Sequence, residues 1–405
     1  MGMLTRQLAY ADKRFHISRL SNEIGDDRRR PRHKAGVVAR SLVLMEMLRL
    51  GSLNLLVRTG TGSLRTWIDG NLPSADTLGR AAESLHADDI RRHVLHTYFV
   101  MRRGKNIRAI RGHRPLVLDG HELFCSDRRH CPHCQTRTIK TRNGERTQYY
   151  HRCVMAMLVH ANGCILLDAE LQRPGEDEMA AAMRILMRLL QTCRQAFDLV
   201  CGDALYMNPS LWKLVQSYGI DVLAVVKNEN RDLYKDAEEI FAEQAPLHLQ
   251  RSPTTSALCW DAQGFTTWPQ VGRPVRIVKS IETTTVRRQL TKQPEDVKTT
   301  WMWATTLSAE RASTQQIVQI GHGRWCIENQ GYNELVNSWH ANHCYRHNAN
   351  AMLVLLLLLC LAYNIFHAML SFNLKPQARA RFTIGDIIAL TQAEFRLLAG
   401  QLHPP

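Results

Sequence analysis

Two aspartates follow short apolar stretches of strand type and have the chemistry of metal ligands. Asp119 ends the run LVLD, and Asp203 follows the run LVCG. Side chains at the strand ends of an open α/β sheet converge on the crevice outside the sheet edge, where ligands bind. Two carboxylates in such a place repel each other unless a cation lies between them, and Mg²⁺ is held by a few carboxylates together with substrate phosphates. The pair therefore predicts a site for a divalent metal ion.

A third acid, Glu328, lies in the stretch GRWCIENQ, which we expect to be helical. Arg324 precedes it by one helical turn, where the guanidinium can pair with Glu328 or bind a phosphate. Taken singly, such acids are more often helix N-caps or surface charges, so the metal site depends on the three acids together. The acids that remain open as alternatives are Glu122, Asp168, Asp177 and Glu178 near the two aspartates, and Glu310 and Glu334 near Glu328.

A second group of possible metal ligands lies between residues 125 and 153. Its centre, CPHC, is a C-x₂-C pair and therefore half of a zinc site. The following stretch TRNGERTQYYHRC predicts a hairpin that returns to this pair. The ligands that we expect are Cys131, Cys134 and His151, with Cys125 or Cys153 as the fourth and with His130 and His133 as further candidates. A zinc ion here is expected to be structural, and the alternative is a reduced loop with exposed thiols.

The positive charge of the chain is concentrated in its N-terminal quarter. The 405 residues have a formal net charge of +15, and residues 1–114 contain 22 Lys and Arg against 10 Asp and Glu, a net of +12. Such an imbalance favours a polyanionic partner, most often nucleic acid, over a merely solvated basic face. Residues 101–115 contain six Lys and Arg and no acid. They predict a linker close to phosphates, with Arg102, Arg103 and Lys105 as candidate DNA contacts.

The chain shows no secretory signal, and its eleven cysteines are scattered as in cytosolic proteins. We therefore expect a cytoplasmic, nucleoid-associated protein. The apolar run AMLVLLLLLCLAYNIF, residues 351–366, is shorter than the roughly 20 apolar residues that a membrane-spanning helix needs. It predicts a buried core helix, so no membrane partner is expected.

The apolar periodicity predicts several structural regions. Residues 35–100 are expected to be helical, with Ser74 as an N-cap behind Pro73, and a helix-turn-helix is one reading of them. From residue 115 the order strand, hairpin, helix, strand, helix, strand predicts an α/β unit with a mixed sheet. The regions that we expect are a helical basic region with its linker (1–114), a first core part with the possible zinc knuckle (115–228), a β-rich insertion (229–299), a second core part (300–372) and a C-terminal tail (373–405).

Several stretches of the sequence resemble bacterial insertion-sequence transposases of the DDE type. They are LVLDGHE, CGDALYMNPS, AVVKNENR, and HGRWCIENQGYNEL followed by WHANHCYRHNANAMLVLLLLL, and the resemblance covers most of residues 70–370. In similar transposases the third acid lies in a tyrosine, arginine, glutamate, lysine signature on one helix. Arg324 and Glu328 match this spacing, whereas Gly321 and Leu335 occupy the tyrosine and lysine positions.

The resemblance implies an RNase H-like core, with the insertion between the second and third acids. It implies that Asp119, Asp203 and Glu328 bind two Mg²⁺ or Mn²⁺ ions and that Arg324 and Lys227 contact DNA. The implied reaction is metal-dependent cleavage and transfer of DNA strands at the ends of an insertion sequence, without a covalent protein intermediate, by a homodimer. Two alternatives stay open: a DDE nuclease that only cleaves DNA, and a zinc-containing DNA-binding protein without catalysis.

Overall fold

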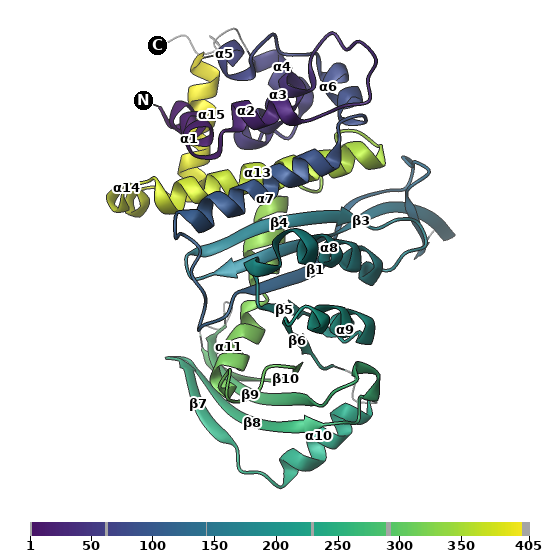
Figure 1. Cartoon of the computed structure of the whole chain (residues 1–405), viewed down its shortest axis with the longest axis vertical. Helices are drawn as coiled ribbons and strands as arrows, with labels where there is room; N and C mark the ends of the chain where they lie inside the picture. Colours follow the sequence, from purple (N-terminus) through teal and green to yellow (C-terminus); the bar gives the residue numbers. More distant parts are fainter. Residues whose placement is uncertain (1, 61–63, 143, 228–230, 289–292, 399–405) are drawn as a thin grey trace.

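The computed structural model describes residues 2–60, 64–142, 144–227, 231–288 and 293–398. A layer of helices lies at one end of the molecule, and a long twisted sheet with helices on its faces forms the rest (Figure 1). The expected fold class is confirmed: an α/β, RNase H-like core with a mixed sheet carries a β-rich insertion and a helical N-terminal region.

The helical layer is built from both ends of the chain. Its helices are α1 (Met3–Phe15), α2 (Ile17–Leu20), η1 (Ser21–Glu23), α3 (Ala35–Leu48), α4 (Leu53–Thr59), α5 (Arg65–Ile68), α6 (Ala75–Ala82), α14 (Pro376–Arg381) and α15 (Ile384–Leu398). Ser74 caps α6 as expected, because its hydroxyl accepts a hydrogen bond from the Thr77 amide. The idea of a C-terminal tail is wrong for 376–398: the Glu394 carboxylate of α15 accepts a 2.6 Å hydrogen bond from the Leu4 amide of α1.

Two long helices, α7 (Ala87–Arg103) and α13 (Ala349–Phe372), separate this layer from the sheet (Figure 1). Helix α13 contains the leucine run and is long and apolar enough to cross a membrane, yet 83% of its most apolar window is buried inside the protein. Asn364 accepts a hydrogen bond from the Leu166 amide and donates one to the Leu166 carbonyl, which attaches α13 to a strand edge. The expected buried core helix is therefore confirmed, and neighbours on all sides explain its apolar surface.

Within the described residues, ten strands form one mixed sheet. Its strands are β1 (Pro115–Ser126), β2 (Gln135–Thr141), β3 (Gly144–His160), β4 (Gly163–Leu171), β5 (Leu199–Gly202), β6 (Asp221–Val225), β7 (Leu247–Ser252), β8 (Thr255–Phe265), β9 (Val275–Arg287) and β10 (Pro294–Thr305). The order is β2-β3-β1-β5-β6-β10-β9-β8-β7, and β4 pairs with β3 in the expected hairpin. Strands β1, β5 and β6 are parallel to one another, so their carboxyl ends meet at one edge.

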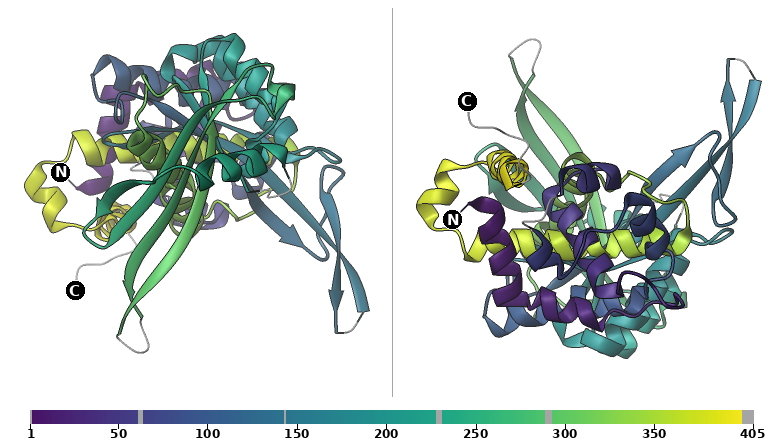
Figure 2. Two further views of the ribbon diagram at one scale, coloured as in Figure 1. Left: turned by 90° about the horizontal axis from the view of Figure 1, so that it is seen from below. Right: turned by 90° about the horizontal axis from the view of Figure 1, so that it is seen from above.

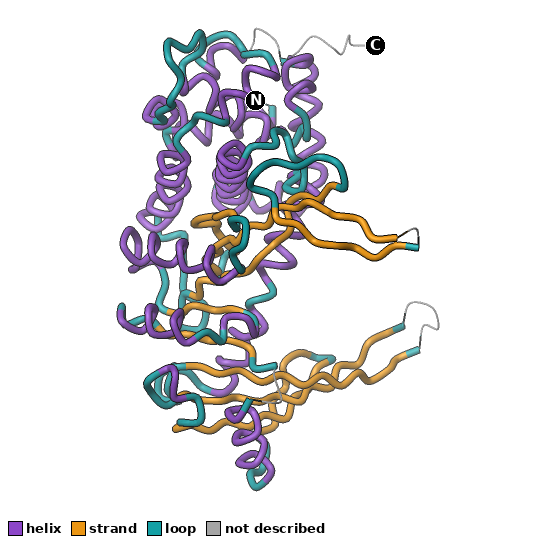
Figure 3. Tube along the Cα trace, turned by 90° about the vertical axis from the view of Figure 1, so that its right-hand side faces the viewer, coloured by secondary structure: helices purple, strands orange, loops and turns teal. Residues whose placement is uncertain are grey.

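Helices cover both faces of this sheet (Figures 1 and 3). Helices α8 (Glu178–Cys193) and α9 (Pro209–Ser217) pack on one face, and α11 (Thr314–Gly323), η6 (Ile327–Tyr332) and α12 (Asn333–Trp339) follow one another on the other side. The insertion adds α10 (Asp232–Ala242), which packs against β8.

The β-rich insertion continues the core sheet instead of forming a separate body. Strand β10 pairs with β6 of the core through its last residues and with β9 of the insertion along its whole length. Two antiparallel ribbons, β2–β3 and β9–β10, project from the body of the protein (Figures 2 and 3). One sheet therefore connects the strands that hold the candidate acids with the insertion.

Candidate active site

Asp119 and Asp203 lie at corresponding positions beyond the parallel pairing of two neighbouring strands. Strands β1 and β5 run parallel, with Val117 and Cys201 as the last pair, so each aspartate follows this pair by two residues, and the Asp203 charge raises the pKa of Asp119. Asp203 follows β5 directly, and its carboxylate accepts a 2.8 Å hydrogen bond from the Leu205 amide. The expectation that the first strand ends at Asp119 is wrong, because β1 stays paired with β3 as far as Ser126.

Arg324 connects Glu328 with Asp119, because its guanidinium contacts both carboxylates. The chain leaves α11 at Gly323 and enters the π-helical segment η6, which contains Glu328. The Arg324 guanidinium lies 3.0 Å from the Glu328 carboxylate and 3.6 Å from the Asp119 carboxylate. The Tyr332 hydroxyl of η6 donates a hydrogen bond to the Asp119 carbonyl. The structure thus brings together Asp119 and Glu328, which lie far apart in the sequence.

A fourth carboxylate, that of Glu178, lies beside this group. Glu178 is the first residue of α8, and its carboxylate packs directly against Gly120. A Cβ atom at position 120 would lie only 2.0 Å from the nearer carboxylate oxygen, so a larger residue would displace Glu178. The Tyr206 hydroxyl donates a 3.1 Å hydrogen bond to Glu178. Glu178 was one of the open alternatives, and its carboxylate lies close enough to Asp119 to raise the Asp119 pKa, while it also pairs with Arg152 at 3.4 Å. Its sequence signal was an acid in the first turn of a helix after a strand.

Burial is the main reason why Asp119 is hard to ionise. Burial raises the pKa of Asp119 from 3.8 to about 7, against the attraction of Arg324. The repulsion from the three neighbouring carboxylates adds to this rise. Burial also raises the pKa of Glu178, where the hydrogen bond from Tyr206 acts in the opposite direction. A divalent cation would relieve the repulsion, so the donor set fits a hard metal ion.

The other acids that the sequence left open have structural partners or lie apart. Asp168 is buried between Arg91 and Arg188, and Glu122 pairs with Arg137. Asp177 caps α8 through the Ala180 amide, Glu334 pairs with His367, and Glu310 is exposed in the turn before α11. These contacts explain four of the five acids without a metal ion, and Glu310 is an exposed surface charge.

The two signature positions that depart from the similar transposases are both part of the core. Gly321 faces the Trp303 ring so closely that a Cβ would come within 2.5 Å of its Nε1 atom, so no larger residue fits there without a shift. Leu335 is fully buried. Neither position can contact DNA as the tyrosine and lysine of the signature would.

Apart from Arg324, which lies between Asp119 and Glu328, the basic residues that we expect to contact DNA lie at two edges of the sheet. Lys227 is exposed two residues after β6 and lies at the same edge as Asp203, because Gly202 pairs with Ala224. Arg102 and Arg103 form the last turn of α7 and are exposed, as is Lys105. The chain that follows them packs beside the β3–β4 turn through a hydrogen bond from the Ala161 amide to the Arg108 carbonyl, at the amino end of β1.

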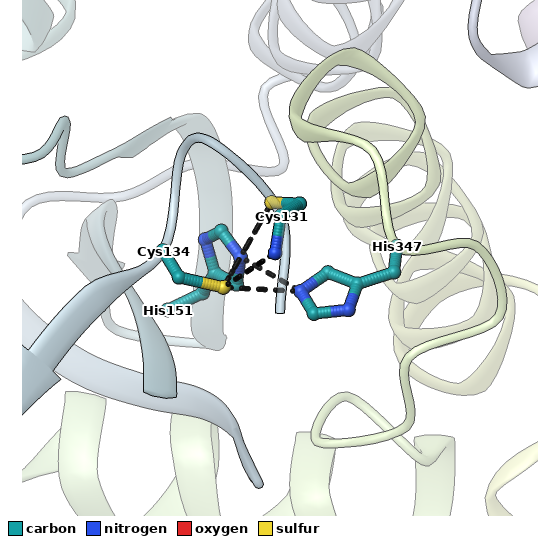
Figure 4. Close-up of side chains that lie close together, drawn as sticks. All are labelled: Cys131, Cys134, His151 and His347. Atoms are coloured by element: carbon teal, nitrogen blue, oxygen red, sulfur yellow. Dashed lines mark hydrogen bonds between the residues drawn. The ribbon is translucent and has the colours of Figure 1, made fainter. Parts of the chain in front are cut away.

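In the structure, the cysteine and histidine group consists of four side chains, Cys131, Cys134, His151 and His347 (Figure 4). Their ligand atoms all lie within 4.8 Å of one another. Burial lowers the pKa of His151 to about 4, so its imidazole is neutral, as a metal ligand must be. His347 was not among the sequence candidates, because it lies more than half the chain away from the C-x₂-C pair.

The structure does not bring Cys125 or Cys153 into this group. The Phe124 ring contacts His347, and side chains alternate along a strand, so Cys125 faces the opposite side of β1 and is exposed. Cys153 is fully buried in β3, and His130 and His133 are exposed. In the structure His347, and not Cys125 or Cys153, lies with Cys131, Cys134 and His151 in the group of possible metal ligands.

Comparison with known families gives one match relevant to these residues. The family described as "Transposase DDE domain" matches residues 118–365, which include the three acids, the insertion and most of α13. The matched region is more than half of the chain. A comparison with curated proteins finds no match.

Proposed function

The chain belongs to the transposase family that this DDE domain defines, and from that premise we propose that it cleaves DNA strands at the ends of an insertion sequence and joins them to target DNA. The observation that supports this reaction best is the grouping of Asp119, Asp203 and Glu328 at the carboxyl end of β5, where the parallel pairing of β5 with β1 ends. Ligands of open α/β sheets bind at such an edge.

We propose that Asp119, Asp203 and Glu328 hold two Mg²⁺ or Mn²⁺ ions. When bound, such ions activate a water or a 3′-hydroxyl for attack on a phosphodiester and stabilise the leaving oxygen. The raised pKa of Asp119 supports this assignment, because added positive charge stabilises the ionised form of a buried carboxyl group. The protein then needs no nucleophilic side chain of its own.

Arg324 acts as a positioning residue for this chemistry. Its side chain is 8% exposed and its guanidinium contacts both Asp119 and Glu328, so it holds the third acid toward the strand that bears the first. The Tyr332 hydroxyl fixes the same segment to the backbone of β1. These contacts position the acids before DNA binds, which lowers the cost of assembling the site.

DNA is the substrate that the family implies, and the charge of the chain fits it. Lys227 lies at the edge that holds the acids and is the best placed of the basic candidates to contact the DNA strand that is cut. The basic N-terminal region would bind phosphates elsewhere along the duplex. We further propose that two copies act together on the two element ends in the cytoplasm.

The experiment uses a duplex that ends in the DNA flanking the coding region, a target plasmid and Mg²⁺. The wild type should cut the duplex and join it to the plasmid. Asp119→Asn, Asp203→Asn and Glu328→Gln should each slow cleavage by at least about 1,000-fold, since metal ligation stabilises the transition state by several kcal/mol. Each variant should still bind the duplex. Glu122→Gln on the same strand as Asp119 is the control and should keep full activity, because Glu122 pairs with Arg137 and lies outside the group.

The other results each lead to a different conclusion. Cut ends that never join the plasmid would indicate a DDE nuclease. Cleavage by Glu328→Gln at the wild-type rate would move the third ligand to another acid. Binding without cleavage by any protein, the wild type included, would indicate a DNA-binding protein without catalysis.

A further inference from the structure

The four side chains Cys131, Cys134, His151 and His347 have the separations of a tetrahedral zinc site. The two Sγ atoms lie 3.8 Å apart, and the two Nε2 atoms lie 3.2 Å apart. Three sulfur–nitrogen separations are 3.2, 3.4 and 3.2 Å. A tetrahedral ion with Zn–S bonds of about 2.3 Å and Zn–N bonds of about 2.0–2.1 Å requires about 3.8, 3.3 and 3.6 Å for these three kinds of pair. Five of the six separations are therefore close to those of a tetrahedral zinc site, and the sixth, between Cys131 Sγ and His347 Nε2, is no longer than 4.8 Å.

Hydrogen bonds alone do not explain this group. His151 Nε2 lies within 3.4 Å of Cys131 Sγ, Cys134 Sγ and His347 Nε2. A neutral ring nitrogen either donates one hydrogen or accepts through one lone pair, so it cannot satisfy three such neighbours. A cation at the centre satisfies all four atoms at once.

The ligands come from both parts of the core that the insertion separates in the sequence. Cys131 and Cys134 lie in the turn between β1 and β2, and His151 lies in β3. His347 lies in the loop between α12 and α13, 213 positions from Cys134 and 196 from His151. It directly precedes Asn348, whose side chain caps α13 through the Ala351 amide and so fixes the end of this loop.

We propose that these four residues bind one structural Zn²⁺ ion that fastens the loop before α13 to the β1–β3 strand pair. Four protein ligands leave no open position, as in structural and not catalytic zinc sites. The Cys131 amide donates a 3.3 Å hydrogen bond to Cys134 Sγ. Such a hydrogen bond stabilises the thiolate form of a cysteine that binds a metal ion. The ion connects the part of the chain that contains Asp119 with the part that contains Glu328, and so keeps the two parts of the core together.

The test measures bound zinc and stability in the full chain, without reference to the reaction. Wild-type protein made with adequate zinc should contain about one zinc per chain. His347→Ala should lose most of it and melt at a temperature lower by at least about 5 °C. His347→Cys should keep the zinc and the stability, because three cysteines and one histidine also form a structural zinc site. Two matched controls, Cys344→Ser on the same loop and Cys125→Ser on β1, should keep the zinc.

A second measurement separates loss of zinc from failure to fold. Wild-type protein that has been treated with a chelator should become sensitive to protease in residues 340–348, and added Zn²⁺ should reverse this. Wild-type protein without zinc, or zinc that His347→Ala retains, would overturn the proposal. Loss of zinc in Cys344→Ser would do so as well, because Cys344 would then be the ligand from this loop.

Discussion

Neutralising Asp119 is expected to stabilise the protein while it destroys the proposed activity. The Asp119 carboxylate is 16% exposed and faces three further acids, and its pKa lies at about 7 in the folded protein against 3.8 for the ordinary group. In Asp119→Asn the amide occupies nearly the same space but cannot ionise. The cost of burying a charged carboxylate at neutral pH, and with it the repulsion from the neighbouring acids, is thereby removed.

The pKa values give the sign and the size of the effect. Between about pH 4 and pH 7, Asp119 is ionised in the unfolded chain but protonated in the folded protein, so the folded state binds more protons and stability falls as pH rises. Above pH 7 the full cost is present, up to about 4 kcal/mol at 1.36 kcal/mol for each pKa unit. Because Glu328 is half exposed, water screens part of the repulsion, and we expect Asp119→Asn to gain about 2 kcal/mol at pH 8 and nothing at pH 4.

The assay is denaturant unfolding of the wild type and Asp119→Asn from pH 4 to pH 8 in Mg²⁺-free buffer. Chelators are avoided, because they would also remove a metal ion from the cysteine and histidine group. Added Mg²⁺ should stabilise the wild type and not the variant, since a ligand that binds the folded state stabilises it. Glu122→Gln serves as the control and should show no gain. A difference between variant and wild type that stays the same at every pH would refute the reasoning.

Two further expectations concern DNA binding and the position of Glu328. In salt titrations against one labelled duplex, Lys227→Ala should reduce the slope of log K against log salt by about 0.9. The combined replacement of Arg102, Arg103 and Lys105 by Ala should reduce this slope by up to about three. Parallel lines for a variant and the wild type would show that the replaced side chains touch no phosphate. With DNA at saturation, the triple variant should cut at the wild-type rate, because its side chains lie at the other edge of the sheet from the acids. Arg324→Lys keeps the positive charge but cannot contact Asp119 and Glu328 at the same time, so the cleavage rate should fall by about 10–100-fold. An unchanged rate across a Mg²⁺ titration would show that Arg324 does not position the acids.

Local patterns in the sequence were enough to predict many elements of the fold. The apolar run before Asp203, the cap at Ser74, the β3–β4 hairpin and the buried helix of residues 351–366 all follow from apolar spacing and turn chemistry over a few residues. Such features depend on neighbours in the chain, which the sequence displays directly. The three acids could not be predicted as one site from local patterns, because each acid alone looked like an ordinary surface charge. The resemblance to transposase motifs suggested that they act together.

Only the tertiary structure decided which distant residues meet. The C-x₂-C pair is visible in the sequence, but His347 joins it because the loop before α13 packs against the β1–β3 pair, while Cys125 is turned away by the alternation of a strand that continues past Asp119. Glu178 joins the acids because Gly120 leaves room for its carboxylate. Contacts of this kind result from the packing of the whole core, where many weak interactions are satisfied together, and no short stretch of sequence contains that information.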